Sequence, residues 1–325
     1  MAHSSRARAD AVVTGPFRIM PTDLAALNQV FSDAFTQRYR SDGMAGVRVP
    51  FLNPAIWRYA IDGAGEGAML WRDERHQIVA FNIAHLSGIE GWMGPLAVRP
   101  DAQDSGLGKR VVMAGVNWLE RSGAQVIGLE TMPRTMDNIG FYSNLGFDPD
   151  RLTITLTLPA ANHDSPGMLL GRLHDSEKMD WLRRCRELTQ SLRPGYDFTR
   201  EIELTDRLAL GDTSLLVRGG KLRGFALYHT APLVEGRVRD ELRVLKLVLA
   251  DYADIDRMAG QLADQSRRSG TRNVAVRVQG EFGQLYRRLL ELGGRVRWTD
   301  LRMTFRGRSE PPLEGGGVVL SNWEI

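Results

Sequence analysis

Residues 96–110 read Leu-Ala-Val-Arg-Pro-Asp-Ala-Gln-Asp-Ser-Gly-Leu-Gly-Lys-Arg, and this stretch decides the fold. It begins within an apolar strand predicted over residues 92–98 and passes through a turn that contains Gly106 and Gly108. An amphipathic helix is predicted next, with apolar residues Val111, Val112, Val116, Trp118 and Leu119. Glycines at a strand-to-helix turn let backbone N–H groups approach an anion, and the helix N-terminus adds the positive end of its dipole. Together with the charge of Lys109, the stretch predicts a pyrophosphate-binding turn.

Other interpretations of a Gly-x-Gly turn fit this stretch less well. A Rossmann turn requires a third glycine, whereas Arg110 and two valines follow here. A P-loop requires Gly-Lys-Ser/Thr after a four-residue gap, and that motif is absent. A tight turn that binds no ligand stays open as an alternative.

A second motif lies at residues 138–147, which read Asn-Ile-Gly-Phe-Tyr-Ser-Asn-Leu-Gly-Phe. It follows the helix and a predicted strand over residues 126–130. The pattern Gln103-x-x-Gly106-x-Gly108 and this second motif, at this spacing, resemble the GNAT superfamily of N-acetyltransferases over roughly residues 15–158. The resemblance implies an α/β (α+β) fold in which a mixed, mostly antiparallel twisted sheet is flanked by helices.

The resemblance also implies a cofactor, acetyl-CoA, and the residues that hold it. In the family the glycine turn binds the pyrophosphate, the preceding strand pairs with the pantetheine arm, and the asparagine of the second motif helps hold the cofactor. The matching residues here are Leu96, Ala97, Val98, Gln103, Gly106, Leu107, Gly108, Lys109, Arg110 and Asn138. Lys109 and Arg110 also fit plain surface positions, and Asn138 also fits a helix cap. The turn departs from the family in having Asp104-Ser105 where a basic residue is common.

Three residues are candidates for the chemistry of acetyl transfer. By resemblance, Tyr142 is the acid that protonates the leaving thiolate, and its alternative is a core aromatic beside Phe141. Glu130 ends the strand beside the cofactor strand and Glu90 begins the cofactor strand, so each is a candidate base for the acceptor amine. Both also fit solvated strand ends, and a water chain could replace a base. A backbone N–H at a bulge in the 96–98 strand is the predicted oxyanion donor.

The whole composition indicates a globular protein without a nucleic-acid or membrane partner. The 325 residues exceed the usual size of one domain, and the net charge of +3 comes without a long basic run. The single cysteine, Cys185, excludes an intrachain disulfide, and no apolar window has the length of a membrane helix. Cysteine and histidine are too few and too scattered to predict a metal site. We therefore expect a cytoplasmic protein, with a homodimer left open.

The second half repeats the element order of the first. The predicted elements of the second half follow one another in the same order as those of the first. They are strands at 214–218, 222–229, 242–249 and 273–278, helices at 254–269 and 282–292, and a strand at 296–305. However, residues 250–256 read Ala-Asp-Tyr-Ala-Asp-Ile-Asp at the place of the glycine turn. Acids suit a helix start but repel a phosphate, so we infer that the second half binds no CoA and caps its helix with its own carboxylates.

These features predict four segments: a disordered N-terminus (1–14), an acetyl-CoA-binding domain (15–160), a degenerate acetyltransferase-like domain (168–307) and a C-terminal strand (315–325). The strand is expected to pack back onto the molecule, and a catalytic role for the carboxylate of Ile325 is the alternative. The predicted function is transfer of an acetyl group from acetyl-CoA to a primary amine of a small molecule or peptide. A non-catalytic acyl-CoA-binding or regulatory module, or a pure interaction protein, are the alternatives.

Overall fold

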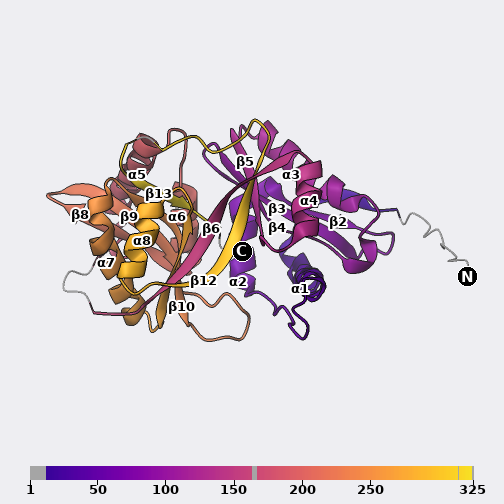
Figure 1. Cartoon of the computed structure of the whole chain (residues 1–325), viewed down its shortest axis with the longest axis horizontal. Coiled ribbons are helices and arrows are strands. Elements are labelled where there is room, and N and C mark those ends of the chain that lie inside the picture. The colour runs from indigo at the N-terminus through magenta and orange to yellow at the C-terminus, as the bar shows by residue number, and fades with distance from the viewer. Residues whose placement is uncertain (1–11, 163–166, 314, 324–325) are drawn as a thin grey trace, which may run out of the picture.

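The protein has two lobes that are joined by long strands crossing the middle of the molecule (Figure 1). A computed structural model describes residues 12–162, 167–313 and 315–323. Of the predicted disordered N-terminus, residues 1–11 lie outside the described residues, and the first strand already begins at Thr14. Ile325 also lies outside them.

The first half contains the elements predicted around the glycine turn. In chain order they are β1 (Thr14–Arg18), α1 (Leu24–Ser41), α2 (Pro54–Ala64), β2 (Ala68–Arg72), β3 (Ile78–Ser87), β4 (Glu90–Val98), α3 (Leu107–Arg121), β5 (Val126–Thr131), α4 (Met136–Asn144) and β6 (Phe147–Pro159).

The second half has the predicted repeat of this order. Its elements are β7 (Met168–Leu169), α5 (Asp175–Leu192), α6 (Thr199–Arg207), β8 (Gly211–Arg218), β9 (Lys221–His229), β10 (Glu241–Leu249), α7 (Ile255–Arg268), β11 (Asn273–Gln279), α8 (Gly283–Glu291), β12 (Arg295–Phe305) and β13 (Val318–Ser321). Cys185 is buried in α5, and burial raises the pKa of its thiol, so it is a structural residue.

The thirteen strands of the described chain form one sheet instead of two separate ones. The order is β1-β2-β3-β4-β5-β12-β6-β11-β10-β9-β8-β7, and β13 pairs with β10. The closing strand of each half has therefore moved into the other half: β12 pairs with β5, and β6 pairs with β11. β6 and β12 also pair with each other along the middle of the molecule, as Figure 1 shows.

The hydrophobic cores show why the exchange is part of the fold. Met303 of β12 is fully buried in the core of the first half, where it packs with Phe147 and the apolar face of α3. Leu156 of β6 is fully buried in the core of the second half. Each half thus completes its core with a strand of the other half, so the two halves depend on each other for stability.

Candidate functional site

Strands β4 and β5 separate part-way along their length, and the separation opens the sheet of the first half. Their parallel pairing runs from Glu90↔Val126 to Met93↔Leu129 and then ends, although β4 continues to Val98. The register between β3 and β4 also shifts by one residue between Asn82 and Ala84, which places a bulge at Gly94–Pro95. β4 therefore has a bulge, but at residues 94–95 and not within the predicted 96–98 segment. Beyond it, the edge of β4 that faces β5 has no strand partner among the described residues.

The glycine turn lies at the end of this open edge. Gly106 has a φ of 78°, a left-handed conformation that favours glycine, and it is the N-cap residue of α3. The first N–H groups of a helix have no partner within it, and here they belong to Leu107, Gly108 and Lys109. The Gln103 side chain donates a hydrogen bond to the Val98 carbonyl at 3.0 Å and so holds the turn against the strand.

The two basic residues after the glycine turn, Lys109 and Arg110, differ in their contacts. Lys109 is exposed at the first turn of α3 and is free to reach an anion. Arg110 is also exposed, but its guanidinium donates to the Val13 carbonyl at 3.2 Å, which ties it to the N-terminal segment. The backbone donors and Lys109 therefore form the anion-binding part of the turn.

A cavity of about 440 Å³ lies where β4 and β5 separate. Its first-half lining comes from α1, from the 49–52 loop, from Trp92 to Leu96 of β4, from Leu129 to Thr131 of β5, and from α4. The second half supplies eight lining residues: Leu233, Arg277, Trp298, Asp300, Arg302, Ser321, Asn322 and Trp323. One cavity thus brings together the β4 bulge, the second sequence motif and the exchanged strand.

Tyr142 and Asn138 both line this cavity from α4. Burial raises the pKa of Tyr142 to about 12, so its phenol keeps its proton at neutral pH. Asn138 donates to the Thr131 hydroxyl at 3.4 Å, which links α4 to the end of β5. The alternative role of Asn138 as a helix cap is wrong, because α4 begins at Met136 and its N-cap residue is Thr135.

Glu130 lines the cavity as predicted, but cationic side chains surround it. It forms ion pairs with Arg277 and, at 3.3 Å, with Arg302, and it accepts a hydrogen bond from Thr153 at 2.6 Å. Burial acts to raise the pKa of Glu130, but the charges of the two arginines outweigh it and lower the pKa. A carboxylate stabilised in this way is a poor proton acceptor.

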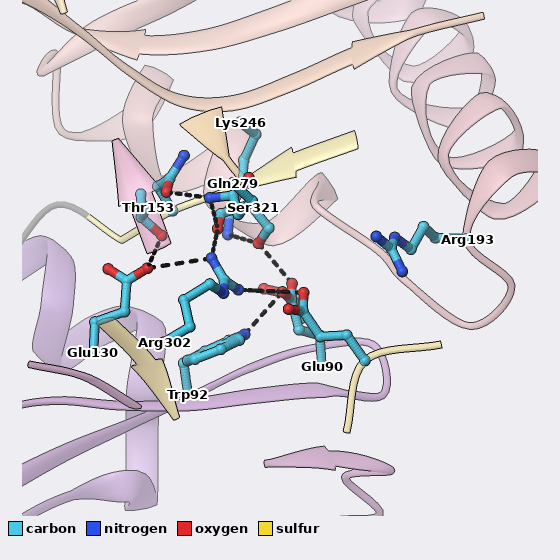
Figure 2. Close-up of polar contacts among 12 residues, drawn as sticks. Glu90, Trp92, Glu130, Thr153, Arg193, Lys246, Gln279, Arg302 and Ser321 are labelled. Carbon is cyan, nitrogen blue, oxygen red and sulfur yellow. Dashed lines mark hydrogen bonds and ion pairs between the residues drawn. The ribbon is translucent and has the colours of Figure 1, made fainter. Parts of the chain in front are cut away.

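Glu90 lies behind the cavity wall and is not among the lining residues. It accepts hydrogen bonds from Trp92 Nε1 at 2.8 Å and from Ser321 Oγ at 2.6 Å. Figure 2 shows Arg302 lying between Glu130 and Glu90, with its guanidinium stacked over the Trp92 ring at 3.9 Å. Of the two candidate bases, Glu130 thus lines the cavity and Glu90 does not, and the hydrogen bonds of Glu90 join the first half to the C-terminal strand.

The residues after β13 bring the end of the described chain into the first half. The Trp323 ring stacks on His85 at 4.2 Å, and the ammonium of Lys246 lies 3.9 Å from the centre of the Trp323 ring. Burial lowers the pKa of His85 to about 3, so this ring is neutral. Lys246 also donates to Ser321 Oγ at 2.8 Å. The C-terminal segment is therefore fixed on both halves and forms one wall of the cavity.

The corresponding opening in the second half is filled by protein. The parallel pairing of β10 with β11 ends at Val244↔Val276, and the register with β9 shifts there as well. Beyond that point β13 pairs with β10 from Lys246↔Ser321 to Leu249↔Val318. Gly317 allows this entry, since a Cβ there would lie 2.5 Å from the Leu249 carbonyl oxygen.

The prediction that the acids of residues 250–256 cap the start of α7 is met only in part. Asp251 accepts a hydrogen bond from the Ala253 N–H at 2.9 Å and caps the turn before the helix. Asp254, the N-cap residue of α7, makes no capping hydrogen bond and pairs with Arg223 at 3.1 Å. Acids thus stand where the first half has its glycine turn.

Comparison with known proteins agrees with this geometry. Residues 27–147 match the model of the acetyltransferase (GNAT) family, so the first half of the chain is a GNAT-family domain. This family assignment supports acyl-CoA-dependent acyltransferase activity. A comparison with curated protein sequences gives no significant match.

Solved structures share the fold over nearly the whole chain. A putative acetyltransferase from Pyrococcus horikoshii matches with a TM-score of 0.65 and 14% identity, over 100% of this chain and 96% of that one. N-myristoyltransferase from Saccharomyces cerevisiae, with bound myristoyl-CoA, has a TM-score of 0.63 and 11% identity, over 96% and 87%. A tandem GNAT protein from the clavulanic acid biosynthesis pathway has a TM-score of 0.60 and 10% identity, over 92% and 100%. The predicted tandem arrangement of GNAT-type folds is confirmed.

The sequence analysis did not find the cavity residues of the second half. Trp298, Asp300 and Arg302 alternate along β12, a signal for one polar strand face, but nothing local places that face in the first half. Arg277 and Ser321 stand in no recognisable motif. Within the described residues, no helix has the length and apolar character needed to cross a bilayer.

Proposed function

We propose that the protein is an N-acetyltransferase that transfers an acetyl group from acetyl-CoA to a primary amine. One observation carries the proposal: the unpaired edge of β4 runs from the cavity beside Tyr142 to the unpaired N–H groups at the start of α3. An extended pantetheine arm fits such a strand edge, because its amide groups can pair with backbone, and a pyrophosphate fits the helix start.

The residues of the site have separate roles in this proposal. The cofactor supplies an acetyl group as an activated thioester. Leu96, Ala97 and Val98 hold the arm through their backbone, and the turn from Gly106 to Arg110 holds the pyrophosphate, with Gln103 and Asn138 in support. The backbone N–H of Gly94 at the bulge stabilises the negative charge that develops on the thioester carbonyl oxygen, since Pro95 has no N–H. Tyr142, which is protonated at neutral pH, gives its proton to the leaving sulfur.

The second half does not bind CoA in this proposal. β13 occupies the gap between its separated strands, and Asp251 and Asp254 occupy the place of the glycine turn. Its role is to supply the second-half wall of the cavity, and so to shape the acceptor site.

Calorimetric titration with acetyl-CoA tests the proposal. We expect one site in the wild-type protein and its loss in Gly108→Glu, because a carboxylate added at the helix start repels phosphate and because the new Cβ would lie 3.3 Å from the Phe141 ring. Gly283→Glu is the matched control: it adds the same charge at the exposed start of α8, with open space around its Cβ.

The results of this titration distinguish an acetyltransferase from the alternative functions. One site that Gly108→Glu abolishes and Gly283→Glu preserves supports the proposal, and thiol release with an amine then separates an enzyme from a binding module. Absence of binding in the wild type contradicts the proposal, and two equivalent sites contradict the assignment of the second half.

A further inference from the structure

The polar end of the cavity holds a carboxylate that neither sequence motif contains. Asp300 lies on β12, the strand that the second half donates to the first, and it lines the same cavity as Tyr142 and Glu130. Its side chain is 16% exposed. One oxygen accepts from Trp298 Nε1 at 3.0 Å, and the other accepts from Arg277 at 2.8 Å. Each carboxylate oxygen has a second lone pair, so Asp300 can still accept from a bound ammonium.

The charged groups around Asp300 form one connected network. Arg277 is shared between Glu130 and Asp300, and Arg302 between Glu130, Glu90 and Glu310. The hydrogen bonds of Ser321 extend this network to Lys246, whose ion-pair partner is Glu201. Of this network, Glu130, Asp300, Arg277 and Arg302 line the cavity, together with Arg38 of α1, so Glu130 and Asp300 are its two carboxylates. Because Arg277 and Arg302 both bind Glu130, Asp300 is the lining carboxylate with the fewer cationic partners.

Much of the rest of the cavity lining is apolar. Its apolar and aromatic residues are Phe31, Phe35, Val49, Leu52, Leu233, Tyr39 and Trp298. Rings of this kind pack against apolar groups and attract cations at their faces. The cavity therefore suits a molecule that combines an ammonium group, for Asp300, with an apolar body.

We infer that Asp300 binds the ammonium group of the acceptor and takes its proton, and that the acceptor is a primary amine on an apolar body. The inference rests on the proposed acetyl transfer. Glu130 is less suited to this step, because Arg277, Arg302 and Thr153 all bind its carboxylate.

The proton and electron balance of the step is complete. Asp300 takes one proton from R–NH₃⁺, and the lone pair of the free amine forms the new C–N bond. The C–S bond breaks with its electron pair on sulfur, and Tyr142 gives sulfur a proton. The nitrogen loses its second proton, which restores the phenol of Tyr142, and Asp300 releases its own proton to solvent. The products are an amide, the free thiol and one proton.

This role predicts the pH dependence of the reaction. Burial raises the pKa of Asp300 and nearby Glu130 acts in the same direction, while Arg277 and the hydrogen bond from Trp298 oppose them. Tyr39 of α1 also faces this carboxylate. Protonated Asp300 cannot accept a proton, so kcat/KM should fall as the pH drops through the raised pKa, and this acidic limb should disappear in Asp300→Asn.

Binding of two nearly isosteric probes tests the assignment without turnover. We would titrate the full-length protein, saturated with CoA, with 2-phenylethylamine and with the uncharged 2-phenylethanol. The wild type should bind the amine at least about tenfold more tightly than the alcohol, since hydrogen bonds to charged groups are the stronger ones. Asp300→Asn should lose this preference, whereas Asp300→Glu should retain part of it.

The same titration with the two probes includes a control variant and can overturn the inference. Asp148→Asn removes a carboxylate from β6 that is 57% exposed and paired with Arg306, outside the cavity, and should bind both probes as the wild type does. Equal binding of amine and alcohol to the wild type, or an unchanged preference in Asp300→Asn, overturns the inference. Titration of each variant with CoA shows that it is folded, and loss of CoA binding in the wild type contradicts the proposed function instead.

Discussion

At the scale of single residues, Arg302 is where the two halves meet. It is 1% exposed, it contacts Glu130 and Glu90 of the first half and Glu310 of the second, and it donates to the Ser321 carbonyl at 3.2 Å. A buried guanidinium costs desolvation energy that several partners must offset. Its position therefore fixes the exchanged strand and the C-terminal strand against the first half.

Tyr142 provides a prediction at this scale. In Tyr142→Phe we expect kcat to fall by about 10²–10⁴-fold, the range for a lost general acid, with the Kd for acetyl-CoA unchanged. Phenylalanine keeps the packing of this ring in the core of the first half, so the substitution removes little besides the hydroxyl. Steady-state kinetics with calorimetry check both quantities, and unchanged turnover would exclude Tyr142 as the acid.

At the scale of elements, β13 is a short strand with a large effect on its surroundings. Its four residues are buried, and it closes the opening between β10 and β11 that the first half keeps open between β4 and β5. Two equivalent pairs of separated strands thus lead to a cavity in the first half and to a packed core in the second. The difference lies in which chain segment enters the gap.

Leu320→Ala tests the contribution of β13. Leu320 is fully buried in the core of the second half, so we expect a loss of about 2–5 kcal/mol in the free energy of unfolding from lost burial and the cavity left behind. Val238→Ala, at a side chain that is 82% exposed, is the control and should change it by no more than about 0.5 kcal/mol. Urea unfolding measures both, and equal stability of the two variants would show that β13 is not tightly packed.

At the scale of the whole molecule, the strand exchange makes one cooperative structure from two similar halves. The core of the first half contains Met303, and the core of the second contains Leu156 and Leu158. A half without its exchanged strand has an open sheet edge and an incomplete core.

We therefore predict that the full-length protein unfolds in a single transition. Thermal melts followed by far-UV and near-UV circular dichroism should coincide, and the calorimetric and van't Hoff enthalpies should agree. Two separated transitions would mean that each half is stable without the strand of the other. Titration with acetyl-CoA should raise the Tm of this single transition, because the ligand binds only the folded state.

Local sequence patterns were enough to predict most of the helices and strands, the turn with Gly106 and Gly108 before α3, and the motif that carries Tyr142. These features depend on backbone conformation and on side-chain periodicity within a few residues, which a single sequence records. Only the tertiary structure decided that β12 completes the first half, that β13 fills the second, and that Asp300 reaches the cavity. β6 and β12 can each pair with either half, so their choice depends on contacts between residues far apart in the chain.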